Sequence, residues 1–120
     1  MKEIKAYIRT SRAEEVIHAL EDAGAAGFTV IEAKAVGASA VPERERFSVE
    51  YAETCSPITK IEVVCSDEET ARLVEVIVKS ASTGRRGDGM VFVSPVDEAV
   101  RIRTGERGED ALFTGRKEGA

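Results

Sequence analysis

The sequence predicts an α+β domain in which two strand–helix–strand units share one antiparallel sheet. Three observations indicate this class: an alternating apolar segment opens the chain, two later segments have helical periodicity, and a β-branched segment follows each of them. The chain has 120 residues and 42% of them are hydrophobic, which is enough for one domain whose core needs no disulfides. We therefore expect a single compact domain.

The first unit combines a strand, a helix and a second strand. Lys2–Ile8 alternates apolar with polar residues, which is the period of a strand with one buried face. A helix is expected over residues 12–23, since an apolar stripe ends there before a glycine and Ser11 with Glu14 forms a capping box at its start. Phe28–Val36 is β-branched at its start and then alternates, which predicts a long second strand.

The second unit repeats this order. Lys60–Cys65 predicts a third strand, and Ser66 with Glu69 supplies another capping box. Apolar residues at helical spacing predict a helix over Asp67–Ala81, and Met90–Val93 predicts a fourth strand. Two such units on one sheet form the ferredoxin-like βαββαβ sandwich.

Two polar segments are expected to lie outside this core. Residues 37–57 join the second and third strands and carry two prolines and a run of alternating charges. A loop longer than about 12 to 15 residues is usually functional or disordered, so we expect a long mobile loop with a role in function. Residues 113–120 form a polar tail of the kind that is often disordered, so the domain itself is expected to span residues 1–112.

Charge and composition exclude several classes of partner. The net charge is -5 and aromatic residues make up 5% with no tryptophan, which argues against binding to nucleic acid. Cys55 and Cys65 do not have a metal-ligand spacing and His18 stands alone on the first predicted helix, so no metal site is expected. The chain has no signal-like apolar start and no window of membrane-spanning length, which predicts a cytoplasmic protein with reduced thiols.

Residues 82–90, here called the glycine loop, form the first candidate binding motif. Within them, Thr83–Gly89 carries three glycines, two arginines and one aspartate. Glycines permit positive φ and close approach, so successive backbone N–H groups can form an anion nest to which the arginines add charge. The structural alternative is a helix C-cap at Gly84 and a turn at Asp88-Gly89, and the local sequence by itself favours this alternative.

A second candidate motif is Arg101-Ile102-Arg103. In an extended segment the two arginines would lie on one face and Ile102 on the other, so that both guanidinium groups point toward one ligand. The alternative is a solvated edge strand whose arginines pair with Glu106 or nearby acidic residues, each pair contributing about 0 to 1 kcal/mol. Neither motif decides the function alone.

Together and in this order, these motifs resemble the trimeric nitrogen-regulatory P-II signal proteins. The resemblance covers nearly the whole chain, and the number of ordered matches argues against chance. The matching stretches are Thr29, Lys34, Gly37, Glu50-Tyr51, Lys60-Ile61-Glu62, Thr83-Gly84, Gly87-Asp88-Gly89, Val91-Phe92-Val93-Ser94-Pro95-Val96 and Arg101-Ile102-Arg103-Thr104-Gly105-Glu106.

The resemblance implies a homotrimer that binds ADP or ATP, with AMP as an alternative ligand. In the family, the glycine loop of one subunit and the Arg-x-Arg segment of its neighbour close on the nucleotide. The mobile loop, here residues 37–57, then reports the ligand state to a membrane transporter or a metabolic enzyme. Tyr51 matches a tyrosine that is uridylylated in some members; the alternative is an unmodified exposed aromatic. The implied nucleotide-binding residues are Thr29, Gly37, Glu62, Val64, Arg85, Arg86, Gly87, Asp88, Gly89, Arg101 and Arg103.

Three positions depart from the family pattern and indicate a divergent branch. Met90 replaces a lysine that contacts the phosphates, so Arg85 or Arg86 would have to compensate and the preference would move toward ADP or AMP. Ser39 and Ile58 replace a glutamine and a lysine that hold Mg²⁺ and 2-oxoglutarate. Losing the charge partner of a dicarboxylate removes about 1.5 to 3 kcal/mol, so 2-oxoglutarate is not expected as a ligand. The loss of the glutamine also makes Mg²⁺ doubtful as a ligand.

Two other functions stay open on the same fold. A slow nucleotide hydrolase would need a base or a metal ligand near the phosphates, for which Asp88 and Glu62 are the candidates. A trimeric metal-tolerance or interaction module would use Cys55 and Cys65 as thiolate ligands, with the glycine loop vestigial. No nucleophile and base pair is evident in the sequence, so we expect a regulator that is not an enzyme.

Overall fold

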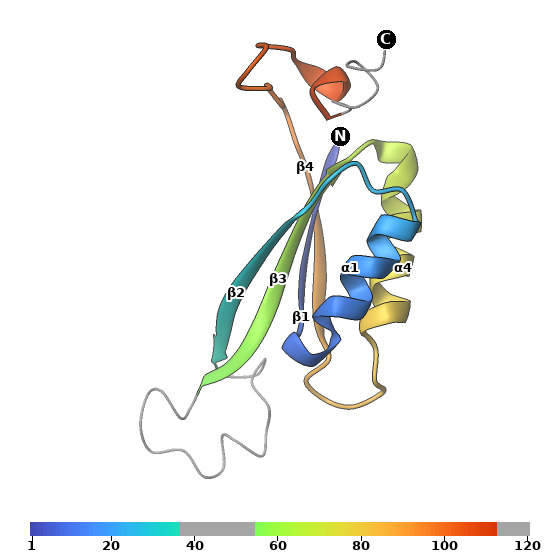
Figure 1. Ribbon diagram of the computed structural model, residues 1–120, viewed down its shortest axis with the longest axis vertical. Helices are drawn as coiled ribbons and strands as arrows, with labels where there is room; N and C mark the ends of the chain where they lie inside the picture. The colour runs from blue at the N-terminus through green and yellow to red at the C-terminus, as the bar shows by residue number, and fades with distance from the viewer. Residues whose placement is uncertain (37–54, 113–120) are drawn as a thin grey trace.

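The computed structural model describes residues 1–36 and 55–112 (Figure 1). Their four strands form one antiparallel sheet in the order β2-β3-β1-β4, and both α-helices pack on the same face of it (Figure 1). The ferredoxin-like α+β prediction is therefore confirmed. The elements in chain order are β1 (Lys2–Arg9), a 3₁₀ turn (Thr10–Arg12), α1 (Ala13–Asp22), β2 (Thr29–Val36), β3 (Cys55–Cys65), α4 (Asp67–Ala81), β4 (Gly89–Pro95) and a second 3₁₀ turn (Gly108–Leu112).

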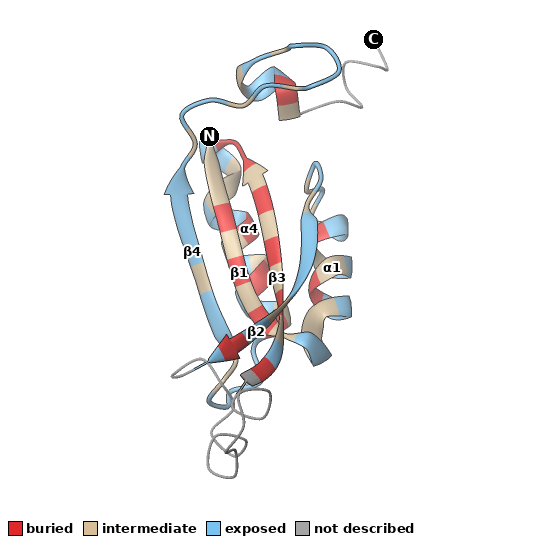
Figure 2. Ribbon diagram, turned by 90° about the vertical axis from the view of Figure 1, so that its left-hand side faces the viewer, coloured by how far each residue is buried: buried red, intermediate tan, exposed pale blue. Residues whose placement is uncertain are grey.

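The core lies between the sheet and the two helices. Alternate residues of β1 and β3 point toward the helices, as the strand period requires, and these residues are buried (Figure 2). The helices contribute an apolar stripe each, with residues spaced three or four positions apart. The fully buried large side chains of this core are Ile4, Val16, Leu20, Ile61, Val63, Leu73 and Ile77.

The opposite face of the sheet has no helix over it within residues 1–36 and 55–112. The Tyr7 and Phe92 rings lie on this open face, 5.9 Å apart in an edge-to-face arrangement. Lys60 Nζ lies 5.6 Å from the centre of the Tyr7 ring and 2.9 Å from a Glu62 carboxylate oxygen. Met90 and Phe92 are each at least half exposed, so the open face carries apolar surface that lacks a partner in the described chain.

The two helix starts differ from each other. The predicted helix Asp67–Ala81 has the bounds of α4, and Ser66 takes the N-cap position. Its hydroxyl donates to Glu69 Oε1 at 3.2 Å, but no side chain in the described part of the chain bonds a cap N–H, so the reciprocal capping box predicted here does not form. The capping box predicted for the first helix is wrong, because Ser11 lies inside the 3₁₀ turn and Arg12 occupies the N-cap position of α1. Arg12 is held there by tertiary contacts, since its Nε and Nη2 donate to the Ser80 carbonyl at 3.0 and 2.6 Å.

The third strand is longer than the sequence predicted. β3 begins at Cys55, so the predicted loop end at residue 57 is wrong and Pro57 lies within the strand. Pro57 pairs with Lys34 of β2. The pairing of β3 with β1 ends at Ile58, so Pro57 lies outside it and its missing N–H removes no hydrogen bond to β1. Residues 37–54 and 113–120, where the mobile loop and the polar tail are predicted, lie outside the described residues.

No helix in the described ranges combines the length and the apolar composition that a membrane crossing requires.

Candidate functional site

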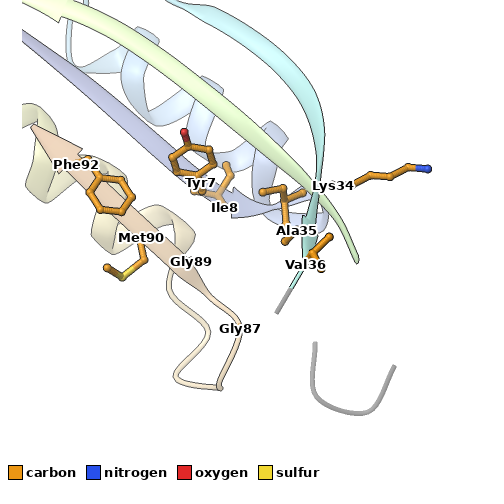
Figure 3. Close-up of a pocket in the computed structure, with 10 residues that line it drawn as sticks. Tyr7, Ile8, Lys34, Ala35, Val36, Gly87, Gly89, Met90 and Phe92 are labelled. Carbon is orange, nitrogen blue, oxygen red and sulfur yellow. The ribbon is translucent and has the colours of Figure 1, made fainter. Parts of the chain in front are cut away.

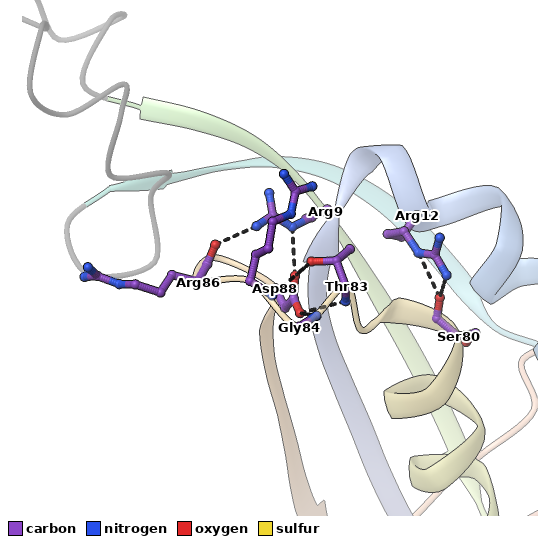
Figure 4. A network of polar contacts seen from close by, with 8 residues as sticks. Arg9, Arg12, Ser80, Thr83, Gly84, Arg86 and Asp88 are labelled. Carbon is purple, nitrogen blue, oxygen red and sulfur yellow. Dashed lines mark hydrogen bonds and ion pairs between the residues drawn. The ribbon is translucent and has the colours of Figure 1, made fainter.

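The carboxylate of Asp88 organises the glycine loop, which connects α4 to the start of β4. Oδ2 of Asp88 accepts hydrogen bonds from the backbone N–H groups of Thr83 and Gly84 at 2.8 and 3.0 Å (Figure 4). Oδ1 accepts from the Thr83 hydroxyl at 2.5 Å and from Arg9 Nε at 2.9 Å. A single side chain thus closes the loop on itself and fastens it to the end of β1.

The glycines of this loop are required by its backbone geometry. Gly84, Gly87 and Gly89 have φ of +81°, +93° and +111°, values that other residues rarely adopt. The C-cap of α4 is Ser82, in extended conformation, so the alternative of a C-cap at Gly84 is wrong. The last two residues of the glycine loop, Gly89 and Met90, belong to β4.

The ionisation of Asp88 should make folding stability depend on pH under acidic conditions. The Thr83 hydroxyl, Arg9 and the backbone N–H groups favour the carboxylate and hold the pKa of Asp88 well below its ordinary value of 3.8. Because the folded pKa is the lower one, this stabilisation is present above pH 3.8 and is lost as the pH falls toward the folded-state pKa.

Urea unfolding measured from about pH 7 to about pH 2.5 checks this prediction. The Asp88→Asn variant has no carboxylate to protonate at this position, so its free energy of unfolding should fall less over the acid range than that of the unaltered protein. Parallel acid losses in the two proteins would contradict the role given to Asp88.

The first candidate cavity, of about 310 Å³, lies where the glycine loop meets the open face of the sheet (Figure 3). Two predicted site residues, Gly87 and Gly89, line it. Its remaining walls are mostly apolar, and Figure 3 shows the Lys34 ammonium directed away from them. The other lining residues are Tyr7, Ile8, Lys34, Ala35, Val36, Ile58, Met90 and Phe92.

The second candidate cavity, of about 370 Å³, contains four other predicted residues: Thr29, Glu62, Val64 and Arg101. The sheet register explains three of them, since Thr29 is directly opposite Glu62 and Val64 is two residues further along the same face of β3. The residues that complete its wall are Glu3, Ala26, Gly27, Phe28, Ala111 and Leu112.

The segment around Arg101 is a turn, so the extended conformation predicted for it is wrong. The Arg101 N–H donates to the Glu106 carbonyl at 2.8 Å, and the Gly105 N–H donates to the Arg101 carbonyl at 2.7 Å. Gly105 has a φ of +74°, which allows the chain to reverse here. Ile102 is fully exposed, and the exposed Arg103 lines neither candidate cavity.

The guanidinium of Arg101 is partly used by the chain itself. Its Nη2 donates to the Ala111 carbonyl in the 3₁₀ turn Gly108–Leu112, and its Nε is buried with no hydrogen-bond partner among the described residues. A buried guanidinium nitrogen without an acceptor is costly in a folded protein, so this atom needs an acceptor that residues 1–36 and 55–112 do not supply.

The predicted residues thus fall into two groups at opposite ends of the sheet (Figure 1). β4 runs from Gly89 to Pro95 between them, and at about 3.3 Å per residue this separates the groups by about 20 Å. Arg85 and Arg86 are exposed on the glycine loop, and Asp88 acts as its organiser rather than as a wall of either candidate cavity. The predicted residues Gly37 and Tyr51 lie outside the described residues.

The sequence prediction missed Arg9, Tyr7 and the 3₁₀ turn that covers Arg101. The predicted strand ended at Ile8, one residue before Arg9, and nothing local indicated that the glycine loop lies beside the end of β1. Within the described ranges no group of three potential metal ligands comes together, and Cys65 is buried with its Sγ 3.5 Å from the Thr70 hydroxyl.

Comparison with known proteins places this arrangement in a family. Residues 1–106 match the family model of the nitrogen regulatory protein P-II. The chain is 49% identical over 112 residues to nitrogen regulatory protein P-II 2 of Methanothermobacter thermautotrophicus, covering 93% of this chain and 97% of that protein. It is 46% identical over 112 residues to nitrogen regulatory protein P-II of Azospirillum brasilense, covering 93% of this chain and all of that protein. The chain therefore belongs to the P-II family of signal-transduction regulators, which act on target proteins.

Proposed function

We propose that this P-II protein binds ADP or ATP, with AMP as the alternative, in clefts between the subunits of a homotrimer. The observation that carries the proposal is the separation of the two half-sites: the glycine loop and Arg101 lie at opposite ends of one sheet. A phosphate held by both groups at once requires the loop of one copy and the arginine of another.

The glycine loop has the properties of a phosphate cradle. Positive φ at Gly84 and Gly87 turns the backbone sharply, and the adjacent Arg85 and Arg86 add positive charge on exposed side chains. The candidate cavity beside Gly87 has apolar walls, which suit a nucleobase or ribose better than a second phosphate.

Arg101 supplies the charge of the other half-site. Its buried Nε needs an acceptor, and a phosphate oxygen from a nucleotide held by a neighbouring subunit would provide one. Thr29 and Glu62 stand beside it with polar side chains that could select the ribose or the base.

The separation of the half-sites also supports a ring of subunits. A contact that joins one end of a subunit to the opposite end of the next is heterologous, and such contacts close into rings when the rotation permits. The open sheet face, with the exposed apolar side chains of Met90 and Phe92, supplies surface that a ring would bury. A homotrimer satisfies both requirements.

Ligands other than nucleotides are given little support by these cavities. Ile58, which lines the first candidate cavity, is uncharged and cannot pair with a carboxylate, which disfavours a dicarboxylate such as 2-oxoglutarate. Mg²⁺ is not proposed as a ligand.

Asp88 is a poor general base for hydrolysis, because its carboxylate already accepts several hydrogen bonds and its pKa is far below neutrality. We propose a regulator that is not an enzyme and that signals to a transporter or metabolic enzyme through the loop 37–57, with Tyr51 as its candidate modification position.

Calorimetric titration with AMP, ADP and ATP tests the proposal. We expect about one nucleotide bound per chain, with no requirement for Mg²⁺ and no heat from 2-oxoglutarate. Bicarbonate is included as a second effector, and inorganic phosphate serves as the control for binding of an anion alone. No binding of any adenine nucleotide would overturn the proposed function.

A further inference from the structure

We propose that Arg9 is a positioning residue that fixes the Gly87 amide of the glycine loop in the orientation that binds phosphate. The inference deepens the nucleotide site and rests on the proposed function. Arg9 lies at the end of β1, and the structure joins it to two points of the glycine loop.

The two contacts use different nitrogens of one guanidinium. Nε donates to Asp88 Oδ1 at 2.9 Å, and Nη2 donates to the Arg86 carbonyl oxygen at 2.5 Å (Figure 4). The Arg9 side chain is only 16% exposed, so water competes weakly for these donors. Arg9 therefore bridges a side chain and a backbone carbonyl that lie on either side of Gly87.

The geometry of the peptide bond connects this contact to the binding site. The peptide between Arg86 and Gly87 is trans, so its C=O and N–H point in opposite directions. Because Arg9 holds the Arg86 carbonyl, the Gly87 N–H must point away from Arg9. Gly87 also lines the first candidate cavity, so its N–H would be a donor for the phosphates of a nucleotide whose base or ribose occupies that cavity.

Packing against Gly87 limits the loop to this orientation. A Cβ added at Gly87 would lie 3.3 Å from Arg9 Nη2, so the guanidinium lies directly against one side of this residue. Gly87 has a φ of +93°, which glycine adopts readily and other residues rarely adopt. Because glycine also adopts other conformations readily, the Arg86–Gly87 peptide can rotate if Arg9 is removed. Arg9 therefore restricts a peptide whose glycine leaves several backbone conformations open.

The shape of the side chain distinguishes arginine from lysine here. A planar guanidinium reaches Asp88 and the Arg86 carbonyl together, whereas an ammonium is a single point of charge. Arg9→Lys keeps the positive charge and loses the bridge. Arg9→Gln loses both and also leaves the Asp88 carboxylate without its cation, which would repel a phosphate.

Nucleotide titrations of a matched set of variants separate geometry from charge. We expect Arg9→Gln to weaken ADP binding about tenfold or more and Arg9→Lys to restore it only in part, since one charge-assisted bond of two is regained. The double variant Arg9→Gln/Asp88→Asn has no Asp88 carboxylate to repel a phosphate, but its Arg86 carbonyl still lacks the Arg9 contact. Its affinity for ADP should therefore stay low. Recovery of full affinity in this double variant or in Arg9→Lys would overturn the inference.

Arg12→Gln is the matched control. Arg12 also clamps a backbone carbonyl, that of Ser80 near the end of α4, and it stands three positions from Arg9 (Figure 4). Its replacement removes the same charge and a similar contact without touching the glycine loop. We expect unchanged ADP affinity in this variant, and a loss equal to that of Arg9→Gln would contradict a specific role for Arg9.

Amide spectra of the nucleotide-free protein test the positioning directly. In Arg9→Gln the ¹⁵N–¹H signal of Gly87 should shift or broaden, while those of Thr83 and Gly84 stay near their positions because Asp88 still holds them. If the unaltered protein binds no nucleotide, the proposed function fails and these spectra alone decide the role of Arg9. An unchanged Gly87 signal in Arg9→Gln would overturn the inference in either case.

Discussion

Replacing Gly89 with alanine is expected to lower the free energy of unfolding by about 3 to 5 kcal/mol, the largest stability effect predicted for this chain. A Cβ at this position would lie 1.7 Å from the Tyr7 carbonyl oxygen and 2.8 Å from the Tyr7 carbonyl carbon. Neither atom can move without breaking the pairing of β1 with β4, which begins at Ile8 and Gly89. The φ of +111° adds strain for any side chain.

Urea unfolding of Gly89→Ala and Gly84→Ala separates these two causes. Gly84 has a φ of +81° but would meet no atom within 4 Å, so its replacement should cost only the backbone strain of about 1 kcal/mol. Gly27→Ala, at a position with open space and no positive φ, serves as the neutral control. Equal losses for Gly89→Ala and Gly84→Ala would show that the close approach to β1 is absent in solution.

Mixing two inactive variants is expected to restore nucleotide binding. Arg101→Ala removes the charge of one half-site and Asp88→Ala releases the backbone of the other, and each should weaken ADP binding by about 10- to 100-fold, the value of one charge-assisted contact. When the two variants are refolded together in equal amounts, some clefts lie between an Arg101→Ala subunit and an Asp88→Ala subunit. Such a cleft is intact when the Arg101→Ala subunit contributes its glycine loop and the Asp88→Ala subunit contributes its Arg101. About a quarter of the clefts should therefore recover.

Fluorescence or calorimetric titration of the refolded mixture measures this recovery. The controls are each variant refolded alone, which should stay inactive, and the two variants mixed without unfolding, which should recover only as subunits exchange. A site formed inside one chain would show no recovery in any mixture. That result would contradict the proposal that neighbouring copies share each cleft, whatever the affinity of the unaltered protein.

The order of helices and strands could be predicted from the sequence because it depends on local periodicity. The alternation in Lys2–Ile8 and the helical spacing in Asp67–Ala81 each reflect one buried face, and both elements appear where they were predicted. The ordered motifs also determined the family. In the candidate site, the resemblance indicated individual residues but not how one chain groups them: Arg101 lies in one cavity with Thr29 and Glu62, whereas Gly87 and Gly89 line the other.

Contacts between distant residues decided what the sequence left open. A 3₁₀ turn stands where the capping box at Ser11 was predicted, since Arg12 donates to the carbonyl of Ser80 in α4, 68 positions away. The segment around Arg101, predicted to be extended, is a turn. Gly105 permits the chain to reverse there, and the backbone hydrogen bonds that close the turn could not be predicted from the local sequence.

The glycine loop shows the same division most clearly. Its glycines are evident in the sequence and allow many backbone conformations, so composition alone does not select one. Selection comes from Arg9, which stands 79 positions from Asp88 and is brought beside it by the pairing of β1 with β4. The sequence by itself indicated which residues are candidates for binding an anion, and the tertiary structure decided how they are held, because strand pairing sets neighbours that no local pattern encodes.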